Sequence, residues 1–167
     1  LMKSEGLTLD EVKNLFLMKS GNTLKSLEIL PFTEVDEKIW DMGAHVFLPC
    51  AASRLVTKDQ IDRLCLGGLE TIASGANVPF ADPEIFYGPI AEYADDRVSV
   101  IPDFIANCGM ARVFAYCMQD GAALTDQALF GDVSDTMAKA LDRTFARNTK
   151  RTQLTRTAFE IALEQLT

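Results

Sequence analysis

The sequence predicts an α/β fold, in which a short parallel sheet is flanked by helices and followed by C-terminal helices. Short apolar runs alternate with segments of helical periodicity. The ~20 residues between consecutive runs suit helical crossovers between parallel strands. Three strands are few for a parallel sheet, which is normally buried on both faces. We therefore expect the C-terminal half of a doubly wound domain over residues 1–125. Residues 126–167 are expected to be helices that pack back on it or toward a missing N-terminal domain.

Two capping boxes mark the clearest helix starts. Thr8 is followed three residues later by Glu11, and Thr57 is followed by Gln60 at the same spacing. In this pattern each side chain caps the backbone of the other residue. Gly67–Gly68 then predicts the end of the second of these helices.

Weaker signals predict the other helices. Thr33 is predicted to be the N-cap of a short helix that contains Trp40. Residues 82–84 have the order of an N-cap, a first-position proline and a first-turn acid, and Gly88–Pro89 should interrupt the helix that follows. Helical spacing is also found over residues 109–117 and from Thr125 onward.

Three apolar runs predict the strands, at residues 44–49, 70–73 and 98–102. The first run shows little alternation between apolar and polar residues, as expected for a strand that is buried on both faces. If the strands are parallel, their carboxyl ends lie at the same edge of the sheet, which is where open α/β sheets bind ligands.

The charge balance excludes some partners. The 167 residues carry a net charge of −8, whereas nucleic-acid surfaces need clustered Lys and Arg. No apolar run reaches the ~18 residues of a membrane span, and no secretory signal opens the chain, so we expect a cytoplasmic protein without a membrane partner. From Lys139 onward, six basic residues outnumber three acidic ones. This excess indicates either a solvated helix face or a docking surface for a missing domain or another subunit.

The cysteines and the single histidine do not suggest a metal site. Cys50, Cys65, Cys108 and Cys117 form no C-x-x-C pair, and His45 is the one histidine. We expect buried, reduced thiols and no covalent cysteine catalysis, because no base is placed to activate a thiolate.

Small and amide-bearing residues follow all three predicted strands. These segments are residues 48–52, 75–79 and 102–109. Glycine lets a ligand approach the backbone closely, and asparagine offers a donor together with an acceptor, which suits a ribose hydroxyl or a carboxamide. Asn77 could be a turn residue and Asn107 a helix cap, but both lie at the predicted ligand edge.

These three segments resemble motifs of the glutamate, leucine, phenylalanine and valine dehydrogenases. Residues 46–57 resemble their strand and I-P-C/A-A loop, Gly75-Ala76-Asn77 with Pro79 resembles G-A-N-x-P, and residues 101–109 resemble P-D-x-x-x-N-A-G-G. Order and spacing agree from about Gly6 to Phe145. The resemblance covers the second half of the family's NAD(P)-binding Rossmann domain and the helices after it.

The resemblance implies NAD(P)-dependent oxidative deamination of an L-amino acid to a 2-oxo acid and ammonia. Its partners would be a nicotinamide dinucleotide, either NAD or NADP, and a small amino acid substrate. The family's catalytic lysine and aspartate and its G-x-G-x-x-G turn are not recognisable here, so no catalytic residue is assigned and the piece alone should be inactive. The full-length protein would be a homo-oligomer.

The resemblance also assigns residues of the cofactor site. It places Cys50, Ala51, Gly75 and Ala76 along the cofactor, Asn77 at the nicotinamide ribose, and Asn107 near the carboxamide and the substrate.

The substrate side departs from the family. The pattern G-G-V-x-V-S becomes Gly109-Met110-Ala111-Arg112-Val113-Phe114. Ala111 and Phe114 thus occupy the two substrate positions, and a phenyl ring cannot hydrogen-bond a glutamate side chain. This favours a substrate other than glutamate, unless Phe114 packs into the core. Arg112 is expected to be solvated or to lie between domains, and Met110 and Met118 to fill the core.

Two rivals remain open. A non-catalytic homologue could use the same edge as a ligand-binding or interaction module. A different Rossmann oxidoreductase would carry other residues at positions 77 and 107.

Overall fold

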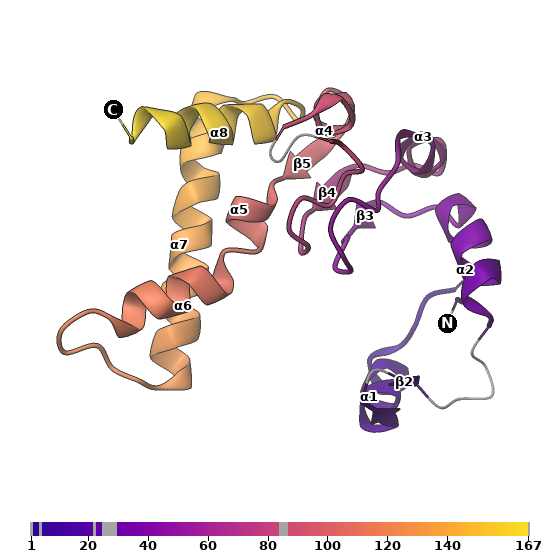
Figure 1. Ribbon diagram of the computed structural model, residues 1–167, viewed down its shortest axis with the longest axis horizontal. Helices are drawn as coiled ribbons and strands as arrows, with labels where there is room; N and C mark the ends of the chain where they lie inside the picture. The colour runs from indigo at the N-terminus through magenta and orange to yellow at the C-terminus, as the bar shows by residue number, and fades with distance from the viewer. Residues whose placement is uncertain (1, 4, 22, 25–29, 84–86, 167) are drawn as a thin grey trace. The chain divides into compact units, whose positions relative to one another are not determined.

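The computed structural model describes residues 2–3, 5–21, 23–24, 30–83 and 87–166. The chain divides into two compact units, Leu1–Gly43 and Ala44–Thr167 (Figure 1). The second unit contains the parallel sheet and every buried residue of the described chain. No helix among the described residues is long and apolar enough to cross a membrane.

The first unit has two helices and a short antiparallel pair of strands. Helix α1 (Leu9–Leu17) begins with the predicted capping box, in which Thr8 and Glu11 each cap the other's backbone. Helix α2 (Phe32–Lys38) begins one residue before Thr33, because the fixed φ of Pro31 starts the helix without a side-chain cap. The other elements are β1 (Lys19–Ser20), β2 (Thr23–Leu24) and the 3₁₀ turn η1 (Ile39–Asp41). The antiparallel pair was not predicted.

The second unit contains the predicted three-stranded parallel sheet, in the order β3-β4-β5. Its strands are β3 (Val46–Phe47), β4 (Thr71–Ala73) and β5 (Ser99–Ile101). The prediction that the first strand is buried on both faces is wrong. It is an edge strand, paired on one side, and Val46 is 56% exposed.

Helices cover the central and far strands and form the core with them. Helix α3 (Lys58–Leu66) begins with the predicted capping box of Thr57 and packs on α4 (Pro89–Asp95). Helices α4 and α8 (Leu154–Glu164) both pack against β5. Ile61, Ile72 and Val100 are almost completely buried between these elements. The α/β fold with a short parallel sheet flanked by helices is therefore confirmed.

Two carboxylates cap the N-termini of helices to which they do not belong as N-cap residues. Asp82 does not begin α4, which starts at Pro89 behind Gly88, but its Oδ1 and Oδ2 accept the N–H groups of Ile90 (2.7 Å) and Ala91 (2.9 Å). The predicted helical residues 84–86 lie outside the described residues. Asp95 accepts the N–H groups at the start of α8 in the same way, from Thr155 and Arg156, both at 3.0 Å.

The remaining helices lead away from the sheet. Helix α5 (Asp103–Ala106) was not predicted, and it follows β5 directly. Helix α6 (Gly109–Cys117) agrees with its prediction, and α7 (Asp126–Arg147) packs on α5, α6 and α8. The helical prediction from Thr125 is broken at residues 148–153, where the Asn148 side chain donates to the carbonyls of Thr152 and Gln153.

Candidate functional site

The loops after the three strands meet at one edge of the sheet, because the strands are parallel. Pro49, after β3, accepts the N–H of Ala76, after β4, at 2.8 Å. Asp103, after β5, accepts the N–H of Val78 at 2.8 Å. Backbone and carboxylate bonds therefore tie the second loop to both neighbours.

Gly75 lies where the loops after β3 and β4 pass close to each other. A Cβ at Gly75 would lie 2.7 Å from the Sγ of Cys50, well inside a normal van der Waals contact. From the sequence we expected a glycine here to let a ligand approach the backbone. In the structure, the thiol of Cys50 occupies the space beside the Cα of Gly75. Ala51, next to it, is exposed, whereas Ala76 is buried.

Asn77 and Asn107 are brought together from loops that are 30 residues apart in sequence. The Nδ2 of Asn107 donates to the Oδ1 of Asn77 at 2.7 Å, and both side chains are exposed. This bond leaves the amide N–H groups of Asn77 and the carbonyl of Asn107 without a further hydrogen bond among the described residues. The pair thus presents donors and an acceptor side by side, as a ribose or a carboxamide requires.

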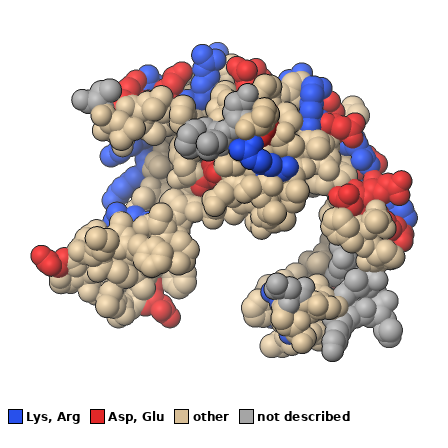
Figure 2. All heavy atoms as spheres, in the orientation of Figure 1, with Lys and Arg blue, Asp and Glu red and all other residues tan. Residues whose placement is uncertain are grey.

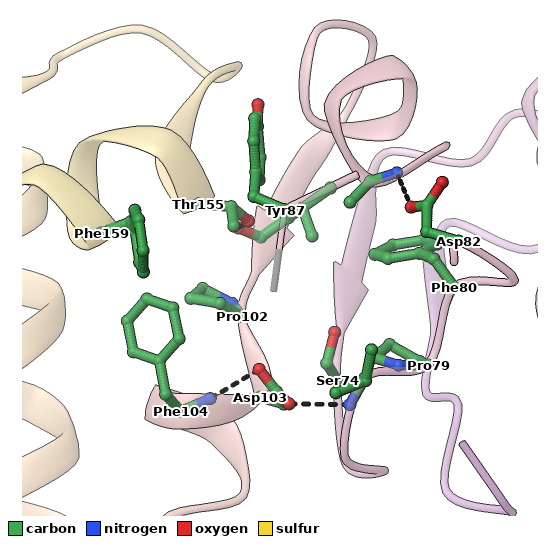
Figure 3. Close-up of a pocket in the computed structure, with 13 residues that line it drawn as sticks. Ser74, Pro79, Phe80, Asp82, Tyr87, Pro102, Asp103, Phe104, Thr155 and Phe159 are labelled. Carbon is green, nitrogen blue, oxygen red and sulfur yellow. Dashed lines mark hydrogen bonds between the residues drawn. The ribbon is translucent and has the colours of Figure 1, made fainter. Parts of the chain in front are cut away.

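Asp103 is a site residue that the sequence analysis did not assign. Its Oδ2 holds Val78, whose φ of 44° is uncommon for a β-branched residue, and its Oδ1 accepts the N–H of Phe104 at 2.9 Å. Figure 3 shows both bonds beside Ser74 and Pro79. The proline before Asp103 and its position directly after a strand were the signals that could have identified it.

A small pocket lies behind this loop, between β5 and α8 (Figure 3). Its free space of ≈ 30 Å³ holds one or two water molecules, so a dinucleotide does not fit into it. Tyr87 lines the pocket and donates to Asp95 at 3.2 Å. Burial raises the pKa of Tyr87, and its hydroxyl therefore stays protonated near neutral pH.

The substrate positions on α6 are exposed rather than buried. Ala111 is exposed and Phe114 is 64% exposed, so Phe114 does not pack into the core. Met110 and Met118 are 66% and 86% exposed, and the prediction that they fill the core is wrong.

Arg112 points away from this apolar stripe. Its guanidinium makes a two-bond ion pair with Asp132 of α7, with Nε–Oδ2 and Nη2–Oδ1 distances of 2.5 and 2.7 Å. Arg112 is therefore paired and only partly solvated, and its partner lies in the part of the chain expected to form the C-terminal helices. The pair joins α6 to α7.

The four cysteines are free, and none is buried, contrary to prediction: Cys50 and Cys117 are exposed and Cys65 and Cys108 half-buried. The exposed positions follow from the open strand-end loop and from the outer face of α6. Among the described residues, no cluster of His, Cys, Asp and Glu could hold a metal ion.

The chain is similar in fold to solved glutamate dehydrogenases. One, from Plasmodium falciparum, has a TM-score of 0.50 at 18% identity, covering 71% of this chain and 26% of that one. A lysine-to-leucine mutant of a glutamate dehydrogenase has a TM-score of 0.60 at 13% identity, covering 94% of this chain and 37% of that one. The chain thus spans about a quarter to a third of these proteins' lengths. No curated protein matches it significantly. The family model described as Glutamate/Leucine/Phenylalanine/Valine dehydrogenase matches residues 1–167, and the chain therefore belongs to that family.

Proposed function

We propose that this chain is the cofactor-binding part of an NAD(P)-dependent dehydrogenase that deaminates a small L-amino acid to a 2-oxo acid and ammonia. The observation that carries the proposal is the Asn77–Asn107 pair at the carboxyl edge of the parallel sheet. Membership of the dehydrogenase family supports the reaction class.

The residues at this edge fit a nicotinamide dinucleotide. Neutral amides can hold a ribose hydroxyl and a carboxamide without adding charge beside the reacting ring. When bound, the cofactor supplies the acceptor for the hydride that leaves the amino acid. The chain's own part is orientation: Asn77 and Asn107 hold each other, and Asp103 fixes the loop that carries Asn77.

Cys50, Ala51, Gly75 and Ala76 are proposed to line the cofactor as backbone walls. The bond from the N–H of Ala76 to the carbonyl of Pro49 supports this role, since it keeps the two loops close together.

The apolar stripe on α6 supports a substrate other than glutamate. Phe114 and Ala111 are exposed and carry no hydrogen-bonding group for a side-chain carboxylate. We assign both to substrate contact, together with Asn107.

The catalytic lysine and aspartate are proposed to lie elsewhere in a longer protein, because this chain matches only 26–37% of the length of the solved structures. In this proposal residues 1–125 complete the Rossmann-like domain and residues 126–167 form the returning helices. The full-length protein is proposed to be a cytoplasmic homo-oligomer, as the family resemblance implies.

The test uses the longest reading frame that contains this chain. Formation of NADH and NADPH is followed with a panel of L-amino acids, for the wild type and for Asn77→Ala and Asn107→Ala. Each variant should raise the KM for the cofactor by about 3- to 10-fold, the value of one lost hydrogen bond. Asn14→Ala, at an exposed asparagine of α1, is the matched control and should leave the KM unchanged.

Phe114→Ser should shift the preference toward glutamate if Phe114 contacts the substrate side chain. A folded wild-type protein that oxidises no amino acid on the panel would refute the proposal and favour the non-catalytic homologue.

A further inference from the structure

A groove separate from the strand-end site lies among α5, α6, α7 and α8. Its free volume is ≈ 360 Å³, within the range of small-molecule sites. Arg112, Lys139 and Arg143 line it, together with Phe104, Ile161 and other apolar residues. Figure 2 shows Lys and Arg side chains gathered in the hollow between α6 and α8.

The basic residues from Lys139 onward differ in whether they form ion pairs. Arg147, Arg151 and Arg156 each form an ion pair, with Glu164, Glu70 and Glu160 respectively. Lys139 and Arg143 have no ion-pair partner among the described residues, and both line the groove. Lys150 is also unpaired among the described residues but lies outside the groove lining, so two of the three unpaired cations of this segment lie together at the groove.

Among the described residues, no acidic one lines the groove. Asp132 of α7 holds the guanidinium of Arg112. Both Arg112 and Lys139 lower the pKa of Asp132, with the hydrogen bond from Arg112 as the largest cause. Asp132 is thus the one carboxylate that interacts with both Arg112 and Lys139, and Arg143 adds a third positive charge. The groove lining is therefore positive, although the chain has a net charge of −8.

The other residues that line the groove indicate which kind of anion would bind there. Lys139 and Arg143 are one helical turn apart on α7, where i,i+4 side chains are neighbours and can hold one anionic group together. Phe104, Ala158 and Ile161 supply an apolar wall beside them. Inorganic phosphate alone would leave that wall in contact with water.

We infer that the groove between α5, α7 and α8 binds a small organic anion, with its carboxylate or phosphate on Lys139 and Arg143 and an apolar body against Phe104 and Ile161. The groove shares Phe104 with the small strand-end pocket but contains none of the residues proposed to contact cofactor or substrate, and the inference does not depend on the dehydrogenase proposal.

The test is calorimetric titration of the full-length protein that contains this chain. Phenyl phosphate is the probe, and inorganic phosphate and phenol supply its two halves separately. Phenyl phosphate should bind more tightly than either half, and high salt should weaken the binding. The double variant Lys139→Gln/Arg143→Gln should lose at least about tenfold in affinity, because two charge-assisted contacts are removed.

Lys150→Gln is the matched control, since Lys150 is exposed, unpaired among the described residues and outside the groove lining. It should bind phenyl phosphate like the wild type. Both groove residues are exposed and without ion-pair partners, so their loss should leave the fold intact, which circular dichroism checks.

Three outcomes would overturn the inference. The double variant could bind phenyl phosphate like the wild type, or inorganic phosphate could bind as tightly as phenyl phosphate. The double variant could also lose subunit association with no change in probe affinity, which would identify the groove as a protein interface. Because the measurement needs neither cofactor nor turnover, an inactive enzyme would not affect its result.

Discussion

The contact between Gly75 and Cys50 gives a prediction whose sign depends on a second residue. In Gly75→Ala the new Cβ would meet the Cys50 Sγ at 2.7 Å, about 1 Å closer than an ordinary contact. The thiol is the end of an exposed side chain and can move away by rotating about its own Cα–Cβ bond. An off-rotamer side chain costs about 0.5–1.5 kcal/mol, and we expect a loss of that size in the free energy of unfolding.

The same substitution should be harmless once the sulfur is removed. In a Cys50→Ala background the nearest atoms to the new Cβ are the Pro49 carbonyl at 3.5 Å and the Cβ of residue 50 at 3.7 Å. The backbone of Gly75 is not in the left-handed region, so alanine is allowed there, and reduced freedom of the unfolded chain should contribute about 0.4–1 kcal/mol. Gly75→Ala is then neutral to stabilising.

The assay is urea unfolding of the wild type, the two single variants and the double variant. The coupling energy of this cycle, the strain in the wild-type background plus the gain in the Cys50→Ala background, is expected to be about 0.5–2.5 kcal/mol. Equal effects of Gly75→Ala in both backgrounds, within about 0.5 kcal/mol, would refute the argument, because the strain would then lie elsewhere than at the sulfur.

Two further predictions concern the carboxylates that cap helices. Asp82→Ala leaves two N–H groups of α4 without an acceptor and should lower the free energy of unfolding by about 2–3 kcal/mol; urea unfolding checks this. Burial raises the pKa of Asp95 above 3.8, against the opposing hydrogen bonds of α8. The folded state then holds its proton more tightly than the unfolded state, so the stability from this group is present below pH 3.8 and is lost as the pH rises through the raised value. Asp95→Asn should remove that part of the pH dependence, measured as unfolding free energy against pH.

Each of these variants has a matched control. Glu92→Ala removes an exposed carboxylate from α4, the helix that Asp82 caps. It should change the free energy of unfolding by less than about 0.5 kcal/mol. Asp96→Asn removes a charge at the exposed neighbour of Asp95 and should leave the pH profile as in the wild type. An Asp82→Ala loss no larger than that of Glu92→Ala would contradict the capping role of Asp82. An unchanged pH profile in Asp95→Asn would contradict the raised pKa of Asp95.

Local sequence patterns predicted the elements that depend on local physics. The capping boxes at Thr8 and Thr57 depend on residues three apart, and both helices start where expected. The strands at 71–73 and 99–101 also agree, because central and covered strands need continuous apolar runs.

Contacts distant in sequence were beyond such patterns. Asp82 was predicted to begin a helix, and no role was predicted for Asp95. Each of them caps a helix through tertiary structure. The sequence placed Asn77 and Asn107 at one sheet edge. Their mutual hydrogen bond depends on the lengths of two loops, which no local pattern encodes.

The attachment of α8 has a consequence for the order in which the chain folds. The hydroxyl of Thr155 donates to the carbonyl of Val100, 55 residues earlier, and the N–H of Arg156 donates to Asp95, 61 residues earlier. During synthesis, β5 and the Asp95 carboxylate are complete long before these partners exist, and closing so long a loop is slow. Until then β5 is covered by α4 but lacks α8, and nascent chains with such exposed apolar surface are prone to aggregate. A stall or truncation before residue 154 should therefore be far more damaging than the loss of one short helix suggests.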